Sequence, residues 1–342
     1  MERWLTRVWY ERGSGASLLA PLGWAYGGIV GARRRAYTRG WLRSVSLDVP
    51  VVVIGNLTVG GTGKTPLVVW LAQRLAASGV AVGIVSRGYK AAGDGVRRVT
   101  ADCDWRAVGD EPLLLRERTG CPVVVGVDRV AAAREVAREP IQLILSDDGL
   151  QHLRLARRGE LVVIDGSRGF GNHRLLPAGP LREPVARVAH ADAVVVNGTP
   201  TPQLTGELAQ LTRSPVFVMQ LKIETACSLA APARRCALAE FRGRPVHAVA
   251  GIGHPARFFR SLAAQGLEPI EHPFPDHHPF SAADLAFADG LPILMTEKDA
   301  MRCRGFASPS MWSVPANAYF EAPAAQALLE GIRARAGLRP SG

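Results

Sequence analysis

Short runs of Val, Ile and Leu recur along the chain, and stretches with helical spacing separate them. This alternation predicts parallel strands covered by helices, as in an α/β fold. In residues 222–245 this alternation gives way to a sequence rich in Ala, Pro and Arg. We therefore expect a boundary between a larger domain at 45–225 and a smaller α/β lobe at 226–342. The expected strands lie at 51–54, 80–86, 123–127, 141–145, 161–164, 193–197, 216–221, 246–250 and 293–296.

The first 44 residues have a different pattern, with eight arginines against two glutamates and with four of the seven tryptophans. Residues 15–31 are apolar, but they include Pro21 and five glycines, and a membrane-spanning helix needs about 20 apolar residues. We therefore predict that residues 1–44 form an amphipathic helical segment on a membrane surface, with a core helix packed on the larger domain as the alternative. Within residues 2–12, one helical face carries Trp4, Leu5, Val8 and Trp9.

Composition and charge narrow the possible partners and the compartment. The formal net charge of +11 indicates an anionic partner, which could be a nucleic acid, a phosphorylated metabolite or a membrane surface. Five scattered cysteines without a C-x-x-C pair predict neither a disulfide framework nor a zinc site, and they are typical of a reducing cytosol. Only four of the 41 basic residues are lysines, so a lysine within a motif indicates a need for a compact charge.

The clearest functional signal is a glycine-rich loop after the first predicted strand, in residues 51–66 (VVVIGNLTVGGTGKTP). Backbone N–H groups of such a loop converge on phosphates at the start of a helix. Lys64 is expected to contact the β- and γ-phosphates, and the Thr65 hydroxyl to bind Mg²⁺. A glycine-rich hairpin is the alternative, but the order of strand, loop and apolar helix favours a phosphate loop. The expected nucleotide-binding residues are Thr58, Val59, Gly60, Gly61, Thr62, Gly63, Lys64 and Thr65.

Two carboxylates follow the apolar strand predicted at 141–145. Asp147 and Asp148 stand where a phosphate-loop protein places an Asp that binds Mg²⁺. The sequence Asp-Asp-Gly also forms ordinary turns, and both carboxylates need not contact the ion. Gln151 and His152, just beyond, are candidates for orienting the site or binding substrate.

A second pair of carboxylates, Asp110 and Glu111, precedes a helical stretch. They are candidates either for favourable charges at a helix N-terminus or for a group that accepts the proton of a hydroxyl during phosphoryl transfer. The segment 274–280 (FPDHHPF) contains two adjacent histidines, which point in different directions in an extended chain. One His acting with a carboxylate is therefore favoured over joint metal binding, and a structural loop is the alternative.

Other loops contain arginines at positions suited to a site. Arg87 and Tyr89 follow the strand predicted at 80–86, which is the usual place for a site loop in a parallel sheet. Arg168 and Arg182 lie in loops rich in Gly and Pro. Either arginine could bind a substrate phosphate, although a solvated arginine is the ordinary interpretation of each one.

Together these motifs closely resemble those of the tetraacyldisaccharide 4'-kinase family, the lipid A 4'-kinases of Gram-negative bacteria. Thr58 stands where the general phosphate loop has Gly, and it fits this family's own pattern. The resemblance covers most of the chain and rests on residues 55–66 (GNLTVGGTGKTP), 86–89 (SRGY), 109–112 (GDEP), 147–152 (DDGLQH), 176–184 (LPAGPLREP), 274–278 (FPDHH) and 296–300 (TEKDA).

The resemblance implies transfer of the ATP γ-phosphate to the 4'-hydroxyl of a tetraacylated glucosamine disaccharide 1-phosphate, by a peripheral enzyme at the cytoplasmic face of the bacterial inner membrane. It also implies a catalytic pair of Asp110 and a second-lobe histidine, for which His277 is favoured and His278 is the other candidate, since the motif alone does not distinguish them. Lys64 would assist catalysis. Mg²⁺ and ATP would be held by Thr65, Asp147 and Asp148, with Glu111 nearby. The implied substrate contacts are Arg87, Tyr89, Gln151, His152 and Arg182.

Two other classes of protein share parts of this pattern. Nucleotide-switch ATPases or GTPases of the partitioning or metal-insertion type use similar loops, but partitioning ATPases have a signature lysine where this chain has Val59, and Lys298 is out of register for guanine recognition. A basic adaptor for membranes or nucleic acid would leave the Asp pairs unexplained. We therefore expect a Mg²⁺- and ATP-dependent lipid kinase that does not bind nucleic acid, with the oligomeric state left open.

Overall fold

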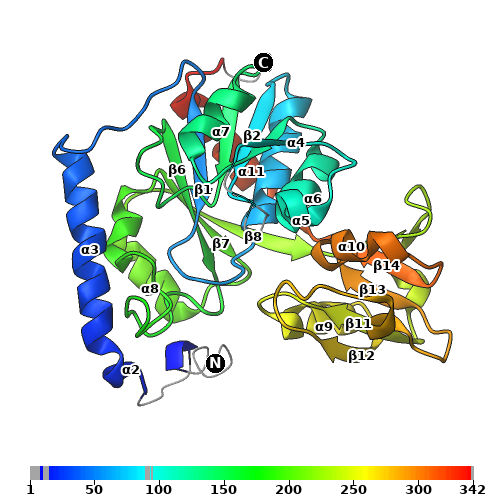
Figure 1. The fold of residues 1–342 in the computed structure, drawn as a ribbon. Helices are drawn as coiled ribbons and strands as arrows, with labels where there is room; N and C mark the ends of the chain where they lie inside the picture. Colours follow the sequence, from blue (N-terminus) through cyan, green and yellow to red (C-terminus); the bar gives the residue numbers. More distant parts are fainter. Residues whose placement is uncertain (1–7, 11–14, 89–92, 94, 340–342) are drawn as a thin grey trace.

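The computed structural model describes residues 8–10, 15–88, 93 and 95–339, and it shows two α/β lobes side by side (Figure 1). The larger lobe has a nine-stranded sheet with the order β15-β8-β7-β6-β1-β5-β2-β4-β3. The edge strands β3 and β15 run antiparallel to their neighbours, and the strands between them are parallel. The bounds are β1 Val51–Gly55, β2 Val82–Ser86, β3 Arg97–Val99, β4 Val123–Val125, β5 Leu143–Asp147, β6 Gly159–Asp165, β7 Ala193–Asn197, β8 Val216–Lys222 and β15 Asn317–Tyr319.

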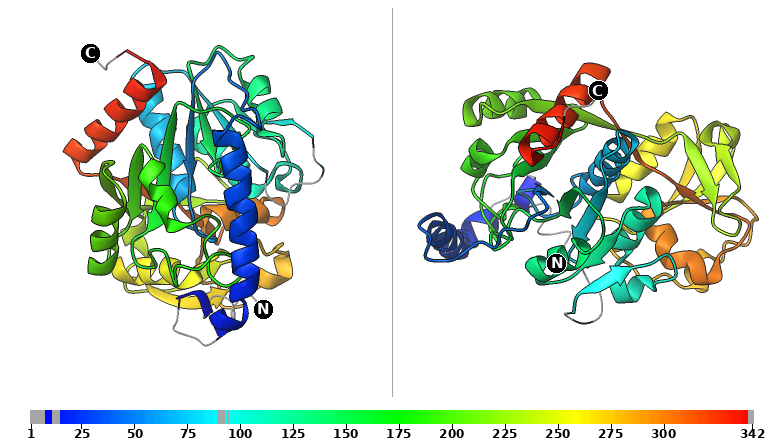
Figure 2. Two further views of the ribbon diagram at one scale, coloured as in Figure 1. Left: turned by 90° about the vertical axis from the view of Figure 1, so that its left-hand side faces the viewer. Right: turned by 90° about the horizontal axis from the view of Figure 1, so that it is seen from above.

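Helices cover both faces of this sheet, because the side chains of each strand point alternately to the two faces (Figures 1 and 2). In β1, Val52 and Ile54 belong to the core shared with α4, α6 and α11, whereas Val51 and Val53 belong to the core shared with α7 and α8. The helices are α4 Lys64–Ala77, α5 Trp105–Val108, α6 Asp110–Thr119, α7 Arg129–Val136, α8 Pro202–Leu211 and α11 Ala322–Ala336, with a 3₁₀ helix at Val185–His190.

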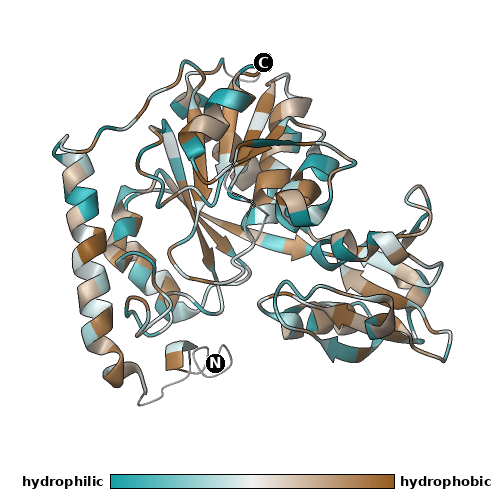
Figure 3. Cartoon of the chain, in the orientation of Figure 1, coloured by the Kyte–Doolittle hydropathy of each residue, from teal (hydrophilic) through white to brown (hydrophobic). Residues whose placement is uncertain are grey.

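The central strands are mainly apolar, as Figure 3 shows by their brown colour, and polar residues such as Ser86, Asp147 and Asn197 stand at their carboxyl ends. All five residues of β1 are buried, and the same holds for β2, β5 and β7. Strands that are buried on both faces lose the alternation of polar and apolar positions. This structure confirms the predicted α/β fold with a parallel sheet around the phosphate loop.

The smaller lobe has a six-stranded sheet with the order β10-β9-β14-β13-β11-β12. Phe259 and Leu262 of α9 pack on this sheet beside Leu294 of β13. The bounds are β9 Thr225–Ser228, β10 Arg235–Ala237, β11 Pro245–Ala250, α9 Pro255–Ala264, β12 Glu268–Pro273, β13 Ile293–Thr296, α10 Glu297–Cys303 and β14 Met311–Val314, with 3₁₀ helices at Leu238–Phe241, Ala282–Leu285 and Arg304–Phe306.

The C-terminal segment differs from the range 226–342 expected for the smaller lobe. After β14 the chain returns to the larger lobe, where β15 pairs with β8 and α11 packs against α4. The Phe320 ring lies 4.6 Å from that of Trp70 in α4, measured between centroids. Hydrophobic periodicity predicts that a segment is helical, but it does not identify a packing partner far away in the sequence.

Helix α3 (Ala20–Thr38), preceded by α2 (Gly15–Leu18), lies along the outside of the larger lobe (Figure 2). Its buried residue is Gly23, where an added Cβ would meet the carbonyl oxygen of Leu175 at 3.1 Å. None of the helices that the structure describes is long and apolar enough to cross a membrane. The amphipathic helix expected at 2–12 falls mostly outside the described residues.

We expect Phe320→Ala to lower the free energy of unfolding by about 3–5 kcal/mol, because it removes a buried aromatic ring from the packing between α4 and the C-terminal segment. Urea denaturation of the full chain measures the change. Val218→Ala in β8, at a position that is 40% exposed, is the control and should change it by less than about 0.5 kcal/mol. Equal effects of the two substitutions would contradict the packing of this segment on the larger lobe.

Candidate active site

The phosphate loop connects β1 to α4 and has the backbone geometry that its glycines allow. Gly60 and Gly63 have φ angles of 103° and 91°, in the region that favours glycine. A Cβ at position 63 would lie 2.3 Å from Asn197 Nδ2, so no larger residue fits there. The loop and the start of α4 therefore present backbone N–H groups to a concave site suited to phosphates.

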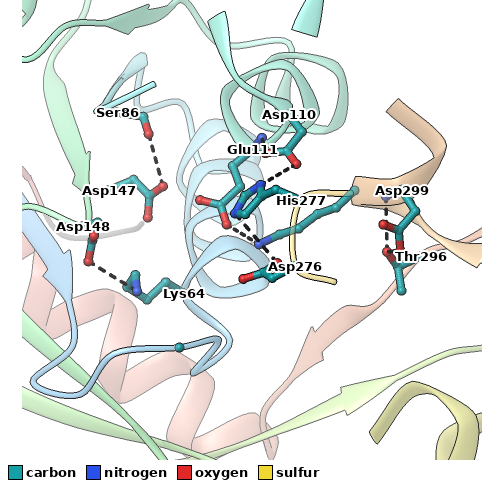
Figure 4. Close-up of polar contacts among 12 residues, drawn as sticks. Lys64, Ser86, Asp110, Glu111, Asp147, Asp148, Asp276, His277, Thr296 and Asp299 are labelled. Carbon is teal, nitrogen blue, oxygen red and sulfur yellow. Dashed lines mark hydrogen bonds and ion pairs between the residues drawn. The ribbon is translucent and has the colours of Figure 1, made fainter. Parts of the chain in front are cut away.

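Lys64 pairs with Asp148 beside the phosphate loop (Figure 4). Its Nζ is 2.9 Å from Asn56 Oδ1 and 3.3 Å from Asp148 Oδ1. Arg182 Nη1 donates to both oxygens of Asp148, at 3.0 and 3.1 Å. Burial would raise the pKa of Asp148, but the charges of Lys64 and Arg182 outweigh it and hold that pKa well below its usual range. One carboxylate thus pairs with two cations that are suited to bind phosphates, and a net positive charge remains.

Asp147 is fully buried, and one of its oxygens makes no hydrogen bond within the described residues. Its Oδ2 lies 3.4 Å from Ser86 Oγ, whereas Oδ1 is the unsatisfied atom. Burial and the charge of Glu111 raise the pKa of Asp147. A cation would stabilise this buried carboxylate, so Asp147 together with the Thr65 hydroxyl fits Mg²⁺.

The chemistry of Mg²⁺ agrees with so few protein ligands. This ion is usually held by one or two carboxylates plus water and phosphate oxygens. Across the described ranges, no group of three or more His, Cys, Asp or Glu side chains is arranged to hold a metal ion without such help. The residues therefore suit an ion that arrives with a nucleotide.

Asp110 and His277 meet across the two lobes (Figure 4). Asp110 begins α6, and His277 lies in the loop after β12, with its Nδ1 3.1 Å from Asp110 Oδ2. His277 has a left-handed φ of 60°, and its backbone N–H donates to Gly251 O at 3.1 Å. Residues held in such a conformation cluster at functional sites. His278 instead lies 3.4 Å from Asp284, so the geometry distinguishes the two adjacent histidines.

Arg302 of α10 binds Asp110 inside the interface between the lobes. Its buried guanidinium contacts Asp110 Oδ2 through Nε at 2.8 Å and also through Nη2, and Nη1 donates to Asp299 Oδ1 at 3.0 Å. Burial would raise the pKa of Asp110, but His277 and the neighbouring cations hold it well below its usual range. Burial raises the pKa of Asp299 to about 6, against the opposing charge of Arg302. One cation therefore joins carboxylates from both lobes.

Two further ion pairs join α6 to α10. Lys298 Nζ contacts Glu111 Oε1, and Arg118 Nη1 lies 2.7 Å from Glu297 Oε1. Glu111 is therefore paired with a cation of the smaller lobe. Because α6 begins at Asp110 and α10 lies directly against it, these two helices form the joint of the molecule.

A cavity of about 1390 Å³ lies between the lobes and contains both halves of the site. The phosphate loop lines it from the larger lobe, and the loop after β12 lines it from the smaller lobe. The predicted residues in its wall are Val59, Gly60, Gly61, Thr62, Gly63, Lys64, Thr65, Arg87, Asp110, Glu111, Asp147, Asp148, Arg168, Arg182 and His277.

Some predicted residues do not line this cavity. Thr58, Gln151 and His152 are outside its wall, and Tyr89 lies outside the described residues. Gln151 Nε2 donates to Glu183 Oε1 at 2.9 Å. Burial and nearby arginine charges lower the pKa of His152 to about 4. The structure thus brings the nucleotide and acid–base candidates together more completely than the substrate candidates.

The site also contains polar residues that the sequence patterns did not reveal. Asn56 Nδ2 donates to Thr58 O at 2.6 Å, and Asn197 Nδ2 donates to Thr62 O at 3.0 Å, so two amides hold the phosphate loop. Both asparagines lie at the carboxyl end of a predicted strand, and this position was the available signal. Arg302 had no comparable signal, because an arginine in the last turn of a helix is common.

The sequence matches one protein family over nearly its whole length. The profile of the tetraacyldisaccharide-1-P 4'-kinase family matches residues 15–333. The tetraacyldisaccharide 4'-kinases of Alkalilimnicola ehrlichii and Azoarcus sp. are 52% and 49% identical to this chain, covering 94% and 95% of it and 93% and 94% of their own lengths. A crystal structure of LpxK from Aquifex aeolicus in complex with ATP has a TM-score of 0.79 and 29% identity, covering 94% of this chain and 99% of that one.

Arg302→Met should lower the free energy of unfolding by about 3–5 kcal/mol, because it leaves Asp110 and Asp299 buried without their shared cation. The loss should be larger at pH 8 than at pH 5. The folded-state pKa of Asp299, about 6, exceeds that of an exposed Asp, so its contribution to stability falls as pH rises through that value, and loss of the cation raises the pKa further.

Urea titrations of the wild type and the variant at both pH values measure this difference. Arg304→Met is the matched control, since Arg304 forms a partly exposed ion pair with Glu117 that should contribute about 0–1 kcal/mol. A loss for Arg302→Met that is independent of pH would contradict the assignment of Asp299 as a carboxyl that depends on this cation.

Proposed function

The chain belongs to the tetraacyldisaccharide-1-P 4'-kinase family, and we propose that it transfers the γ-phosphate of ATP to the 4'-hydroxyl of a tetraacylated glucosamine disaccharide 1-phosphate. The observation that carries this proposal is one cavity lined by the phosphate loop on one side and by the Asp110–His277 pair on the other. Phosphoryl transfer requires the nucleotide phosphates and the acceptor hydroxyl to meet in such a place.

On the nucleotide side, the phosphate loop would cradle the β- and γ-phosphates with its backbone N–H groups. Lys64, now 3.3 Å from Asp148, would turn its charge toward those phosphates. Thr65 and Asp147 would hold Mg²⁺, with Asp148 and Glu111 close by. When bound, the ion would neutralise charge on the phosphates during transfer.

On the acceptor side, the Asp110–His277 pair would accept the proton of the 4'-hydroxyl. As the acceptor oxygen bonds to the γ-phosphorus, the bond from that phosphorus to the bridging oxygen of ADP breaks, and the hydroxyl proton moves to the pair. Arg302 and the backbone contact of His277 with Gly251 hold the two side chains in place before the substrate arrives. The pair thus needs little rearrangement to act.

The acceptor carries a phosphate of its own, which needs cationic partners. Arg87 and Arg182 line the cavity and have the charge and the planar donors that suit a phosphate. Tyr89, Gln151 and His152 remain candidates for the substrate on the evidence of the sequence motifs. Binding of ATP would compete with Asp148 for its cations, which would release Arg182 for such contacts.

Helix α3 offers a surface for the membrane that contains an acylated acceptor. Leu22 and Ile29, which are seven residues apart on one helical face, are 58% and 68% exposed, whereas Gly23 on another face packs against the lobe. Figure 3 shows apolar positions along this helix. An exposed apolar stripe near arginines suits a membrane interface. We therefore propose a peripheral enzyme at the cytoplasmic face of the bacterial inner membrane, with no nucleic-acid partner.

The alternative of a nucleotide-switch ATPase or GTPase of the partitioning or metal-insertion type is not favoured. The family and the relatives that match nearly the whole chain are kinases. A switch protein would also have no use for an acid–base pair contributed by a second lobe.

Asp110→Asn and His277→Ala should each lower the turnover of lipid phosphorylation by about 10²–10⁴-fold, the usual contribution of a positioned acid–base group, with little change in ATP affinity. Transfer of labelled γ-phosphate to the disaccharide 1-phosphate, scored beside ATP hydrolysis, measures the effect. His278→Ala is the matched control and should stay within about threefold. Turnover of Asp110→Asn within that same range would refute its role in proton transfer.

Leu22→Glu should weaken binding of the full chain to phosphatidylethanolamine–phosphatidylglycerol vesicles by about 10–150-fold, because burial of a leucine side chain contributes about 1.5–3 kcal/mol. Vesicle co-sedimentation measures the partition. Val216→Glu, at a position that is 43% exposed on the larger lobe, is the control and should bind like the wild type. Unchanged partition of Leu22→Glu would exclude this face of α3 as the membrane surface.

A further inference from the structure

Arg257 of the smaller lobe contacts two buried polar side chains of the larger lobe. It lies in the first turn of α9, with Nη1 3.1 Å from Asp165 Oδ2 at the end of β6 and Nη2 2.9 Å from Asn197 Oδ1 at the end of β7. Asp165 and Asn197 are 5% and 1% exposed. These bonds connect the lobes in addition to the joint formed by α6 and α10.

Asn197 continues this connection to the phosphate loop. While its Oδ1 accepts from Arg257, its Nδ2 donates to Thr62 O at 3.0 Å, so both ends of the amide are bonded. Asp165 is also fixed, because its Oδ1 accepts from the backbone N–H of Ser167 at 3.0 Å. Arg257, Asn197 and the Thr62 carbonyl thus form a continuous hydrogen-bonded relay from the smaller lobe to the phosphate loop.

The local structure of α9 does not explain an arginine at this position. The helix begins at Pro255, and a positive charge in its first turn meets the positive end of the helix dipole, which is unfavourable. The Arg257 side chain is only 30% exposed and lines the cavity, so it is not an ordinary solvated charge. Its planar guanidinium, held by two acceptors, fixes both distance and orientation. The contact with the larger lobe therefore explains why an arginine stands at position 257.

We propose that Arg257 is a positioning residue for phosphoryl transfer, which acts through Asn197 to couple the placement of the smaller lobe to the conformation of the phosphate loop at Thr62. The inference rests on the proposed kinase function, in which the smaller lobe supplies His277 and the phosphate loop holds ATP. Because the relay ends on the phosphate loop, ATP binds most tightly when the smaller lobe is placed so that Arg257 contacts Asn197. Arg257 therefore does not need to touch the reacting atoms.

The test compares Arg257→Met and Arg257→Lys with Arg260→Met in the full chain. Arg260 is the matched control, because it is an exposed arginine on the same helix and does not line the cavity. Calorimetric titration with Mg²⁺ and ATP gives the affinity, steady-state assays give KM for each substrate, and thermal unfolding verifies the fold of every variant.

Arg257→Met should weaken ATP binding and raise the KM for ATP by about tenfold, the usual effect of losing a charged hydrogen bond. The KM for the lipid should stay within about twofold, since the relay ends on the phosphate loop. Arg257→Lys should recover part of the loss, because an ammonium can still donate to Asn197 or Asp165. Equal ATP affinity of Arg257→Met and Arg260→Met would overturn the proposal, as would equal losses for both substrates.

A double-mutant cycle with Asn197→Ala tests the route through that amide. If Arg257 acts through Asn197, the double variant should bind ATP no more weakly than Asn197→Ala alone. If the fold-decreases in ATP affinity of the two single variants multiply in the double variant, the two residues act independently and the relay is overturned. The two proposals can fail separately. If the ATP affinities of the variants show the relay but the wild type phosphorylates no lipid acceptor, the relay is supported and the proposed function is refuted.

Discussion

The buried ion pair between Asp110 and Arg302 is the contact on which the rest of this site depends. A buried carboxylate without its cation costs several kcal/mol, so the two helices that carry the pair are held face to face. This contact places the start of α6 against α10 and leaves Asp110 Oδ2 beside His277 Nδ1, at 3.1 Å. An interaction that stabilises the joint between the lobes thereby also brings together Asp110 and His277, the proposed acid–base pair.

The polar residues of the site form a set of internal ion pairs that a polyanion can rearrange. Asp148 pairs with both Lys64 and Arg182, while Glu111 contacts Lys298. Each pair offsets the free-energy cost of removing its charged groups from water at the wall of the cavity. A nucleotide with its Mg²⁺ brings both signs of charge, so it can take over these cations and carboxylates without leaving unpaired charges behind.

The N-terminal helix is connected to the same site. Tyr26 Oη donates to the carbonyl oxygen of Arg182 at 3.1 Å, and Arg34 lies 3.9 Å from Glu183. The helix with the exposed apolar stripe thus packs on the loop whose arginine binds Asp148. In a kinase for an acylated acceptor, this arrangement would bring the cavity close to the membrane surface from which the substrate comes.

Features that depend on neighbours in the chain could be predicted from the residues alone: the buried strands, the glycine geometry of the phosphate loop and the carboxylates at strand ends, which include Asp147 and Asp148. The motif FPDHH left two adjacent histidines, His277 and His278, as candidates for the partner of Asp110. The folded structure was needed to show that His277 lies beside Asp110, that α11 returns to the larger lobe and that Arg302 and Arg257 connect the lobes. Each of these contacts joins segments far apart in sequence, and an arginine in a helix has no local pattern that identifies its partner.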